Sequence, residues 1–584
     1  MRRRKWKAEM RKQIAVGATI LFLFLGACNL PVRETPGETQ PQEQVNEPAP
    51  PSDQLASSNS SLADLYEIGN PSLKDLYVSP SGSDEKDGLS RAAPLRTIGA
   101  AWAKIPQEVL NGTGYRVNLL PGQYRCEGDC INFFSGLHGT LAFPIILQAA
   151  DGPDTVTLLG GLNIFDVSYL YLLDLRLEAG REAGAGFGNN VLHIEKGDHV
   201  LLRGLTLHGP QTCSTDQCND IQEVLKVNQS QYVYLEQSEL SGAFQTALDF
   251  FSVQYGHLLA NRIHFSGGRC AYLKGGSAYF QVEGNEFSDC IEAGFQAGEG
   301  SNLAFMQTPW LHYEAYDIKV VNNLFHDIHG AGLSVSGGYN ILMAYNTLYR
   351  VGLEDASGRP WALVQLIPGA RGCYAADELG GENGTQTRCQ SLLDQGAWGT
   401  AALGEENGGE WIPNRNIFIM NNLFYNPAGA ATRYVQFVVN GPLIPPGQTR
   451  NIPTPSCKDE NLIIRGNAIW NQPIEAGDLV GDNNGSGNIG CRDDNPTCNT
   501  TRLLTENTVN AFEPQLRDPA NGDFHPITGS NLLTVHAVPI PDFSWADAPV
   551  IPPVPPGDPG NQIIHDYDGR PRAADGMVGA FVVK

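Results

Sequence analysis

The chain has 584 residues, of which 65 are Gly and 38 are Pro, and it carries a formal net charge of −24. A chain of this length can bury a large core, and abundant Gly and Pro are typical of a protein rich in turns. The strong negative charge disfavours nucleic acids and anionic lipid surfaces as partners, because it would repel both of them.

The first predicted element is an export signal. Residues 1–12 are basic and residues 14–25 are apolar, an order typical of a signal peptide and too short for a membrane-spanning helix. The segment ends Leu25-Gly26-Ala27-Cys28, which resembles the lipobox of bacterial lipoproteins. The resemblance implies that residues 1–27 are removed and that a lipid on Cys28 is the only membrane attachment. An ordinary signal peptide with a chance Cys is the alternative.

A tether and then a folded body follow the signal. Residues 28–73 are rich in Pro, Glu, Gln and Ser and offer little to bury, so we predict a disordered tether. Residues 76–105 read as a strand, a turn and an amphipathic helix, which resembles the entry segment of secreted right-handed β-helix proteins. We place the body at 74–545 and a closing segment at 546–584.

One short pattern recurs through the body: an alternating apolar strand, a polar corner and a large apolar residue. The corner residues are Ser238, Asn261, Asn285, Asn323, Asn346, Asn422 and Asn467. The basic separation is 23 or 24 residues, a period of short strands that is typical of a solenoid. Stacked Asn side chains can hydrogen-bond along such a column, and we expect these Asn residues to adopt the left-handed backbone of a sharp corner.

The predicted fold class is therefore all-β: a right-handed parallel β-helix with an N-terminal capping strand and helix. Two stretches break the rhythm, and we predict long insertions at about 301–315 and 351–414. Loops of this length in a compact body are usually functional or disordered.

The cysteines occur in near pairs. After Cys28 the pairs are Cys126/Cys130, Cys213/Cys218, Cys270/Cys290, Cys373/Cys389 and Cys491/Cys498, with Cys457 left over. Disulfides are expected in an exported protein, and zinc is disfavoured because no His follows in register. Cys270 and Cys290 lie most of a coil apart, so we expect them to join neighbouring coils.

Three charged residues, Asp249, Lys274 and Glu299, recur at intervals of 25 residues. Equivalent positions of successive coils stack about 4.8 Å apart, and strand alternation points Asp249 and Lys274 outward. Arg262 and Arg269 lie on the turns that flank Lys274. We therefore predict a mixed row of carboxylates and cations on one outer sheet.

The first insertion adds candidate substrate-binding residues above this row. They are Trp310, His312, Tyr313 and Glu314. An aromatic ring and a polar group in such a loop can contact a sugar, although isolated Trp residues in loops are as often packing anchors.

This arrangement resembles the active face of the right-handed β-helix polysaccharide lyases that act on pectate, chondroitin and alginate. In those families a Lys or Arg removes the proton α to a uronate carboxylate, and calcium or cationic side chains hold that carboxylate. The resemblance implies Lys274 as base, Arg269 and Arg262 as carboxylate partners, and Asp249 and Glu299 as calcium ligands. A Lys base must be neutral near working pH, which requires neighbouring cations or desolvation.

We therefore predict a monomeric, lipid-anchored protein of the cell envelope that binds an acidic polysaccharide and cleaves it by β-elimination. The sequence leaves other interpretations open. A non-catalytic carbohydrate-binding or adhesion module would use the same face, and a structural envelope protein would need no ligand. Outward charges along a sheet are most often a solvated salt-bridge ladder. Residues 274–287, 309–323 and 329–352 also resemble bacterial β-helix proteins with no assigned reaction, over about 74–480.

Overall fold

The computed structural model describes residues 65–583, except 126–131, 179–189, 210–221, 354–360, 405–409, 431–434, 445–450, 457–459, 472–478, 483–486, 545–559 and 574–575. The predicted signal peptide, the lipidation residue and most of the predicted tether lie outside these residues. Cys28, Cys126, Cys130, Cys213, Cys218 and Cys457 also lie outside them.

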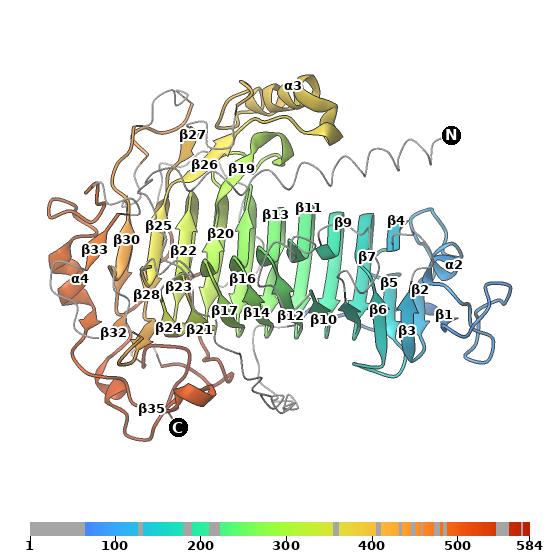
Figure 1. Ribbon diagram of the computed structural model, residues 1–584, viewed down its shortest axis with the longest axis horizontal. Helices are drawn as coiled ribbons and strands as arrows, with labels where there is room; N and C mark the ends of the chain where they lie inside the picture. Colours follow the sequence, from blue (N-terminus) through green and yellow to red (C-terminus); the bar gives the residue numbers. More distant parts are fainter. Residues whose placement is uncertain are drawn as a thin grey trace, which may run out of the picture.

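The described residues form one elongated stack of parallel strands, coil upon coil (Figure 1). Each coil presents three faces to the outside. A 19-stranded sheet bends to make faces 1 and 2, and a 12-stranded sheet makes face 3. The prediction of an all-β parallel β-helix is confirmed.

Face 1 contains β4 (Asn132–His138), β15 (Arg269–Lys274), β18 (Ala293–Ala297), β22 (Ala331–Ser336), β25 (Val364–Ile367), β30 (Phe437–Val439) and β33 (Val480–Gly481). The long strands β7 (Leu162–Leu173), β9 (Asn190–Arg203), β11 (Glu223–Glu236) and β13 (Thr246–Leu259) begin on face 1 and continue into face 2. Face 2 also contains β1 (Leu73–Val78), β2 (Gly114–Leu119), β5 (Ile145–Ala149), β16 (Ser277–Glu283), β20 (Ala315–Val321), β23 (Gly338–Ala344), β28 (Arg415–Met420) and β31 (Ile463–Arg465).

Face 3 contains β3 (Gly122–Arg125), β6 (Val156–Leu159), β8 (Arg176–Glu178), β10 (Thr206–His208), β12 (Glu239–Ala243), β14 (Arg262–Ser266), β17 (Glu286–Cys290), β21 (Leu324–Ile328), β24 (Thr347–Val351), β29 (Leu423–Asn426), β32 (Ala468–Asn471) and β34 (Thr508–Val509). Outside the coils lie β19 (Gly300–Asn302), β26 (Gly369–Gly372), β27 (Glu410–Ile412), β35 (Leu516–Asp518) and β36 (Asp523–Pro526), with helices α2 (Ile98–Trp102), α3 (Gly381–Leu393) and α4 (Thr500–Glu506) and the short 3₁₀ helices η3 (Leu303–Phe305), η4 (Asp377–Leu379), η6 (Pro519–Asn521) and η7 (Asn531–Thr534).

The predicted column of corner residues forms a continuous hydrogen-bonded ladder between faces 2 and 3. Each corner backbone N–H donates to the side-chain oxygen of the corner Asn in the next coil at 2.9–3.0 Å, from Ser238 to Asn507. Because these amides are buried, each bond satisfies a polar group that water cannot reach.

The expected left-handed backbone lies one residue earlier than predicted. The residues that precede the ladder members from Ser238 to Asn467 have φ of +48° to +57° where they are not Gly: Gln237, Ala260, Asn322, Tyr345 and Asn421. The prediction that the ladder Asn residues themselves take this conformation is wrong. The ladder selects Asn for its side-chain amide, which both donates and accepts, rather than for its backbone freedom.

Three of the expected disulfides lie in the described residues and form: Cys270–Cys290, Cys373–Cys389 and Cys491–Cys498. Cys270 and Cys290 are fully buried in the core. Cys290 stacks on Ser266, at the end of the preceding coil's β14, while Cys270 lies on β15. This bond therefore joins β15 and β17, the first and last strands of one coil, across the corner between faces 3 and 1, rather than two neighbouring coils.

The end of the predicted tether is ordered against the body. β1 begins at Leu73, and residues 65–72 precede it along face 2. The Tyr66 backbone N–H donates to Glu236 Oε1 at 2.6 Å, and its ring stacks on Tyr234 with centroids 4.6 Å apart. The entry helix α2 follows, capped by the Thr97 hydroxyl.

The predicted insertion at 351–414 is interrupted by one strand of the body. β25 pairs with β22 in parallel and belongs to face 1, so it divides the range into two loops. The second loop contributes β26, β27 and α3, and β26 pairs with β19 of the first insertion. These elements gather above the C-terminal half of the stack (Figure 1).

The C-terminal segment does not close the end of the solenoid as predicted. The last strand of the body ends at Val509, before the predicted boundary at 545. The chain then packs on the outside of faces 2 and 3, where Phe524 contacts Tyr349 and Phe543 contacts Phe418. The segment packs there because large apolar side chains on the outer surface of these coils offer it apolar contacts.

Candidate functional site

The outer surface of face 1 carries a row of charged side chains on β11, β13 and β15. Strand alternation explains their direction: Leu225, Leu248 and Leu273 point into the core and are fully buried, so their neighbours point outward. The paired register places Lys226 beside Asp249, and Asp249 beside Tyr272.

The predicted column of Asp249, Lys274 and Glu299 is therefore out of register. Lys274 pairs with Phe251, two residues after Asp249. The physical reason is the coil length, because the stacked positions are 23 residues apart here rather than 25. Strict use of the 23-residue period would have predicted Lys226, Asp249 and Tyr272 as one column, and this was the signal that we missed.

Lys226 joins two carboxylates at the start of the row. Its Nζ lies 2.7 Å from Asp249 Oδ2 and 3.3 Å from Glu223 Oε1. Asn190 also donates to the other oxygen of Glu223 at 2.7 Å. Burial disfavours the charge on Lys226, but Asp249 and Glu223 outweigh burial and raise its pKa. The ammonium is held in its charged form.

The two carboxyl groups of this cluster respond to burial in opposite directions. Burial raises the pKa of Glu223, more than Lys226 lowers it. Burial also acts to raise the pKa of Asp249, but Lys226 and Lys274 outweigh it and hold the pKa below the ordinary value. Asp249 is therefore the more acidic of the two carboxyl groups, although it is only 1% exposed.

Lys274 and Arg269 meet at Glu299. Lys274 Nζ lies 2.7 Å from Glu299 Oε2, and Arg269 Nη2 lies 2.9 Å from Glu299 Oε1. Arg269 also binds Glu292 at 2.8 Å. Burial acts to raise the pKa of Glu299, but Arg269 and Lys274 overcome this and lower it. The predicted association of Lys274, Arg269 and Glu299 is present despite the error in register.

Tyr272 occupies the centre of the row, between the cations and Asp249. Lys274 Nζ donates to the Tyr272 hydroxyl at 3.1 Å and also lies over its ring, 4.3 Å from the centroid. Burial, with the charges of Asp249 and Glu299, raises the pKa of Tyr272 well above its ordinary value. Tyr272 thus holds its proton in this arrangement, next to an ammonium that would stabilise its phenolate.

Arg262 is not part of this row, and its predicted place beside Lys274 is wrong. It lies on β14 of face 3, where it is 54% exposed and binds Glu286 at 3.4 Å and Glu239 at 3.9 Å. A residue close to Lys274 in sequence lies on a different face because a corner separates β14 from β15.

Of the predicted substrate-binding residues of the first insertion, Trp310, Tyr313 and Glu314 are buried inside it, and His312 is partly exposed. Trp310 is 4% exposed and Tyr313 is fully buried, and both pack in an aromatic cluster with Tyr316 and Trp398. His312 binds the Gly396 carbonyl at 3.0 Å, and burial with the nearby Arg371 lowers its pKa to about 4. Trp310 and Tyr313 hold the insertion together, so the predicted contact of these two buried side chains with substrate is wrong for this arrangement.

Glu314 forms a fully buried ion pair with Arg371, next to the corner at Gly275 that follows β15. Arg371 Nη2 lies 2.6 Å from Glu314 Oε1, and both side chains are fully buried. Glu314 Oε2 also accepts the backbone N–H of Gly275, at 3.2 Å. Arg371 donates further to the carbonyl of Leu311 at 2.9 Å and to that of Trp398 at 3.1 Å. The pair therefore ties the two insertions to the chain immediately after Lys274.

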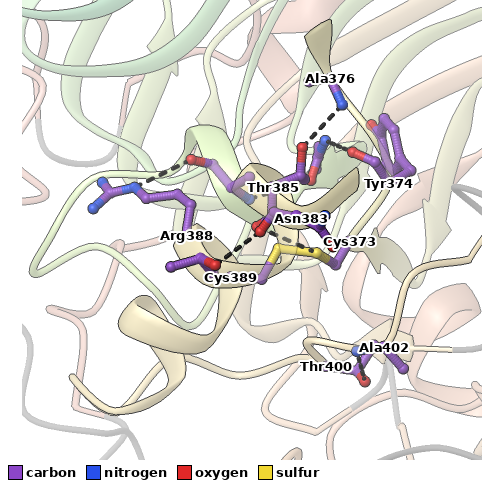
Figure 2. Close-up of a disulfide and its surroundings, with 12 residues drawn as sticks. Cys373, Tyr374, Ala376, Asn383, Thr385, Arg388, Cys389, Thr400 and Ala402 are labelled. Atoms are coloured by element: carbon purple, nitrogen blue, oxygen red, sulfur yellow. Dashed lines mark hydrogen bonds between the residues drawn. A yellow bond between two sulfur atoms is a disulfide. The ribbon is translucent and has the colours of Figure 1, made fainter. Parts of the chain in front are cut away.

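A disulfide fastens the outer part of the insertions, where Figure 2 shows Cys373 bonded to Cys389 of α3. Arg388 extends from the same helix and donates to the Ala304 carbonyl of η3 at 3.4 Å. The η3 segment in turn contacts face 1, because Gln229 donates to the Phe305 carbonyl at 2.8 Å and the Phe305 ring meets that of Phe251. The insertions thus build a wall beside the charged row.

Asp249 and Glu299 do not fit a shared calcium ion. Each carboxylate is bound by ammonium or guanidinium groups rather than turned toward the other. Calcium requires six to eight oxygen ligands. Within the described residues no group of three or more His, Cys, Asp or Glu side chains is placed to hold a metal ion.

A match to a protein-family model supports the fold. Residues 191–359 match the family model described as a right-handed β-helix region. No curated protein sequence matches the chain. Among solved structures, a rhamnogalacturonan lyase is 10% identical and covers 69% of this chain and 90% of its own, with a TM-score of 0.40. A pectate lyase is 12% identical and covers 88% and 97%, with a TM-score of 0.36.

An alginate lyase from Paenibacillus is 16% identical over 43% of this chain and 84% of its own, with a TM-score of 0.31. The described helices include none that is both long and apolar enough to cross a membrane. The chain is a parallel β-helix, and its residues 191–359 match the model of a right-handed β-helix region.

Proposed function

We propose that face 1 binds an acidic, uronate-containing polysaccharide and cleaves it by β-elimination. One observation carries the proposal: Arg269, Lys274 and Tyr272 converge on one outer face, beside the wall formed by the insertions. The side chains of Arg269 and Lys274 remain 24% and 14% exposed, so a ligand can reach them. A substrate carboxylate would compete with Glu299 for the two cations.

The residues divide the reaction between them. Arg269 holds the uronate carboxylate and stabilises the negative charge that develops there when the neighbouring C5 proton leaves. The Tyr272–Lys274 pair, once it has lost one proton, accepts that C5 proton. The C4–O bond then breaks, its electron pair leaves on the oxygen, and a C4=C5 double bond forms. The departing oxygen takes up a proton.

The ultraviolet absorbance of the unsaturated uronate product tests this reaction. The mature chain is incubated with a panel of uronate polymers, beside the variants Lys274→Ala and Tyr272→Phe and the control Arg262→Ala. We expect both variants to lose at least 100-fold in rate, on the order of the contribution of a general acid or base. Arg262→Ala, on face 3, should retain the wild-type rate. A correctly folded wild type that is silent on every polymer would contradict β-elimination.

A non-catalytic carbohydrate-binding or adhesion module is the second candidate, and one observation favours it. Lys274 contacts both Glu299 and the face of the Tyr272 ring, and both contacts favour its charged form over the neutral form of a base. In that case the same variants would weaken binding, and the wild type would bind polymer without releasing product.

We further propose that this monomeric protein is exported and held at a membrane surface by a lipid on Cys28. The three disulfides of the described residues are typical of exported proteins. The arrangement would present face 1 to polymers outside the cell.

A further inference from the structure

The charges beside Tyr272 are ordered coil by coil along face 1. The coil of β15 presents two cations, Arg269 and Lys274. The preceding coil, of β13, carries the carboxylate of Asp249, which is 1% exposed and bound by Lys226 at 2.7 Å. The following coil, of β18, presents Glu292 just before the strand and Glu299 just after it. The cationic coil of β15 thus lies beside an acidic coil, that of β18, whose carboxylates are accessible.

The wall next to this row runs along the axis of the solenoid. The first insertion leaves the coil of β18, yet its η3 segment reaches back over two earlier coils. There Phe305 contacts Gln229 of β11 and Phe251 of β13. A polymer that follows this wall crosses the strands and passes the coils in succession, about 4.8 Å apart.

From this geometry we infer that the site takes a polysaccharide whose carboxylates lie on alternate sugars, rather than one with a carboxylate on every sugar. The inference rests on the proposed function, in that face 1 must bind an acidic polysaccharide. The coil spacing is close to the advance of an extended glycan per sugar. A uronate bound at the coil of β15 therefore places its neighbouring sugar on one side opposite the acidic coil of β18.

The neighbouring sugar on the β18 side decides the selectivity. If it is neutral, its hydroxyl groups can donate to the carboxylate of Glu292, whose side chain is 41% exposed. If it is a uronate, it brings a like charge to Glu292 and Glu299, which is unfavourable. The acidic character of the whole chain, at −24, acts in the same direction. We expect these repulsions together to lower the affinity for a polymer with a uronate on every sugar at least tenfold.

Calorimetric titration with oligosaccharides of equal length tests the inference. The two probes are hyaluronan, in which glucuronate alternates with N-acetylglucosamine, and polygalacturonate, in which every sugar is a uronate. The mature wild-type chain is compared with Glu292→Gln. This change removes a negative charge from the acidic coil of β18, at a side chain that is 41% exposed. Glu239→Gln, on face 3, is the matched control. Formation of the unsaturated product is recorded in the same samples.

The wild type should bind hyaluronan at least tenfold more tightly, and Glu292→Gln should raise the affinity for polygalacturonate more than that for hyaluronan. Glu239→Gln should keep the wild-type ratio. Equal affinities, or a preference for polygalacturonate, would overturn the inference. Preference for hyaluronan without any product would uphold it and reject β-elimination. Failure of both probes to bind would reject both proposals.

Discussion

Two ion pairs of similar chemistry flank the corner at Gly275, and they differ in their access to solvent. Lys274 and Glu299, on face 1, are 2.7 Å apart with side chains 14% and 26% exposed. Arg371 and Glu314, under the insertions, are 2.6 Å apart and fully buried. A charged ligand can compete for the first pair but cannot reach the second. The comparison shows that burial, rather than residue type, separates a candidate binding group from a structural tie.

The largest effect is expected from Arg371→Met. The change leaves the Glu314 carboxylate buried without its partner, which should cost about 3–5 kcal/mol in the free energy of unfolding. Denaturant titration followed by tryptophan fluorescence measures the loss. Arg262→Met is the matched control, because its guanidinium is 54% exposed and surface pairs contribute about 0–1 kcal/mol. A loss below about 1 kcal/mol for Arg371→Met would show that the tie is dispensable.

An intermediate effect is expected from Cys373→Ser combined with Cys389→Ser. Their separation of 16 residues corresponds to a stabilisation of about 3 kcal/mol from the closed loop. Because the bond lies in the insertions, we expect faster hydrogen exchange in β26 and α3 while the coils stay protected. The control is Cys491→Ser with Cys498→Ser, where a separation of 7 residues closes a shorter loop. Unchanged exchange in α3 would mean that the apolar contacts suffice.

The smallest effect is expected from Glu299→Gln. The pKa of Glu299 is lowered in the folded protein, so its ionised form stabilises the fold above the ordinary carboxyl pKa. That contribution is lost as the pH falls through the lowered folded-state pKa. The variant should therefore be less stable than wild type at pH 7, and the gap should close in acid. Unfolding curves across this pH range measure it. A gap that widens in acid would contradict the assigned direction.

Much of the fold followed from the sequence, because a solenoid repeats the same local demands. The corner Asn residues at a period of 23 or 24 predicted the ladder, and its next member, Asn507, was missed only because loop-like sequence surrounds it. Three cysteine pairs were predicted by proximity in sequence. β25 was missed, because two long loops surround a strand of four residues.

The candidate site was predicted in part. Lys274, Arg269, Asp249 and Glu299 do share face 1. Tyr272 and Lys226 were missed because the row was aligned at 25 residues, and a shift of two residues keeps the inward and outward pattern intact. Alternation alone therefore could not reveal the error.

The sequence by itself determined the repeating body, since each strand, corner and core position depends on neighbours at one fixed period. Tertiary structure decided which charges meet and which are sealed. Arg371 reaches Glu314 across 57 residues, and no period relates the two insertions that carry them. The fate of such pairs depends on how the insertions fold back on the coils and exclude water. That exclusion makes Glu314 a structural tie and leaves Lys274 accessible on face 1.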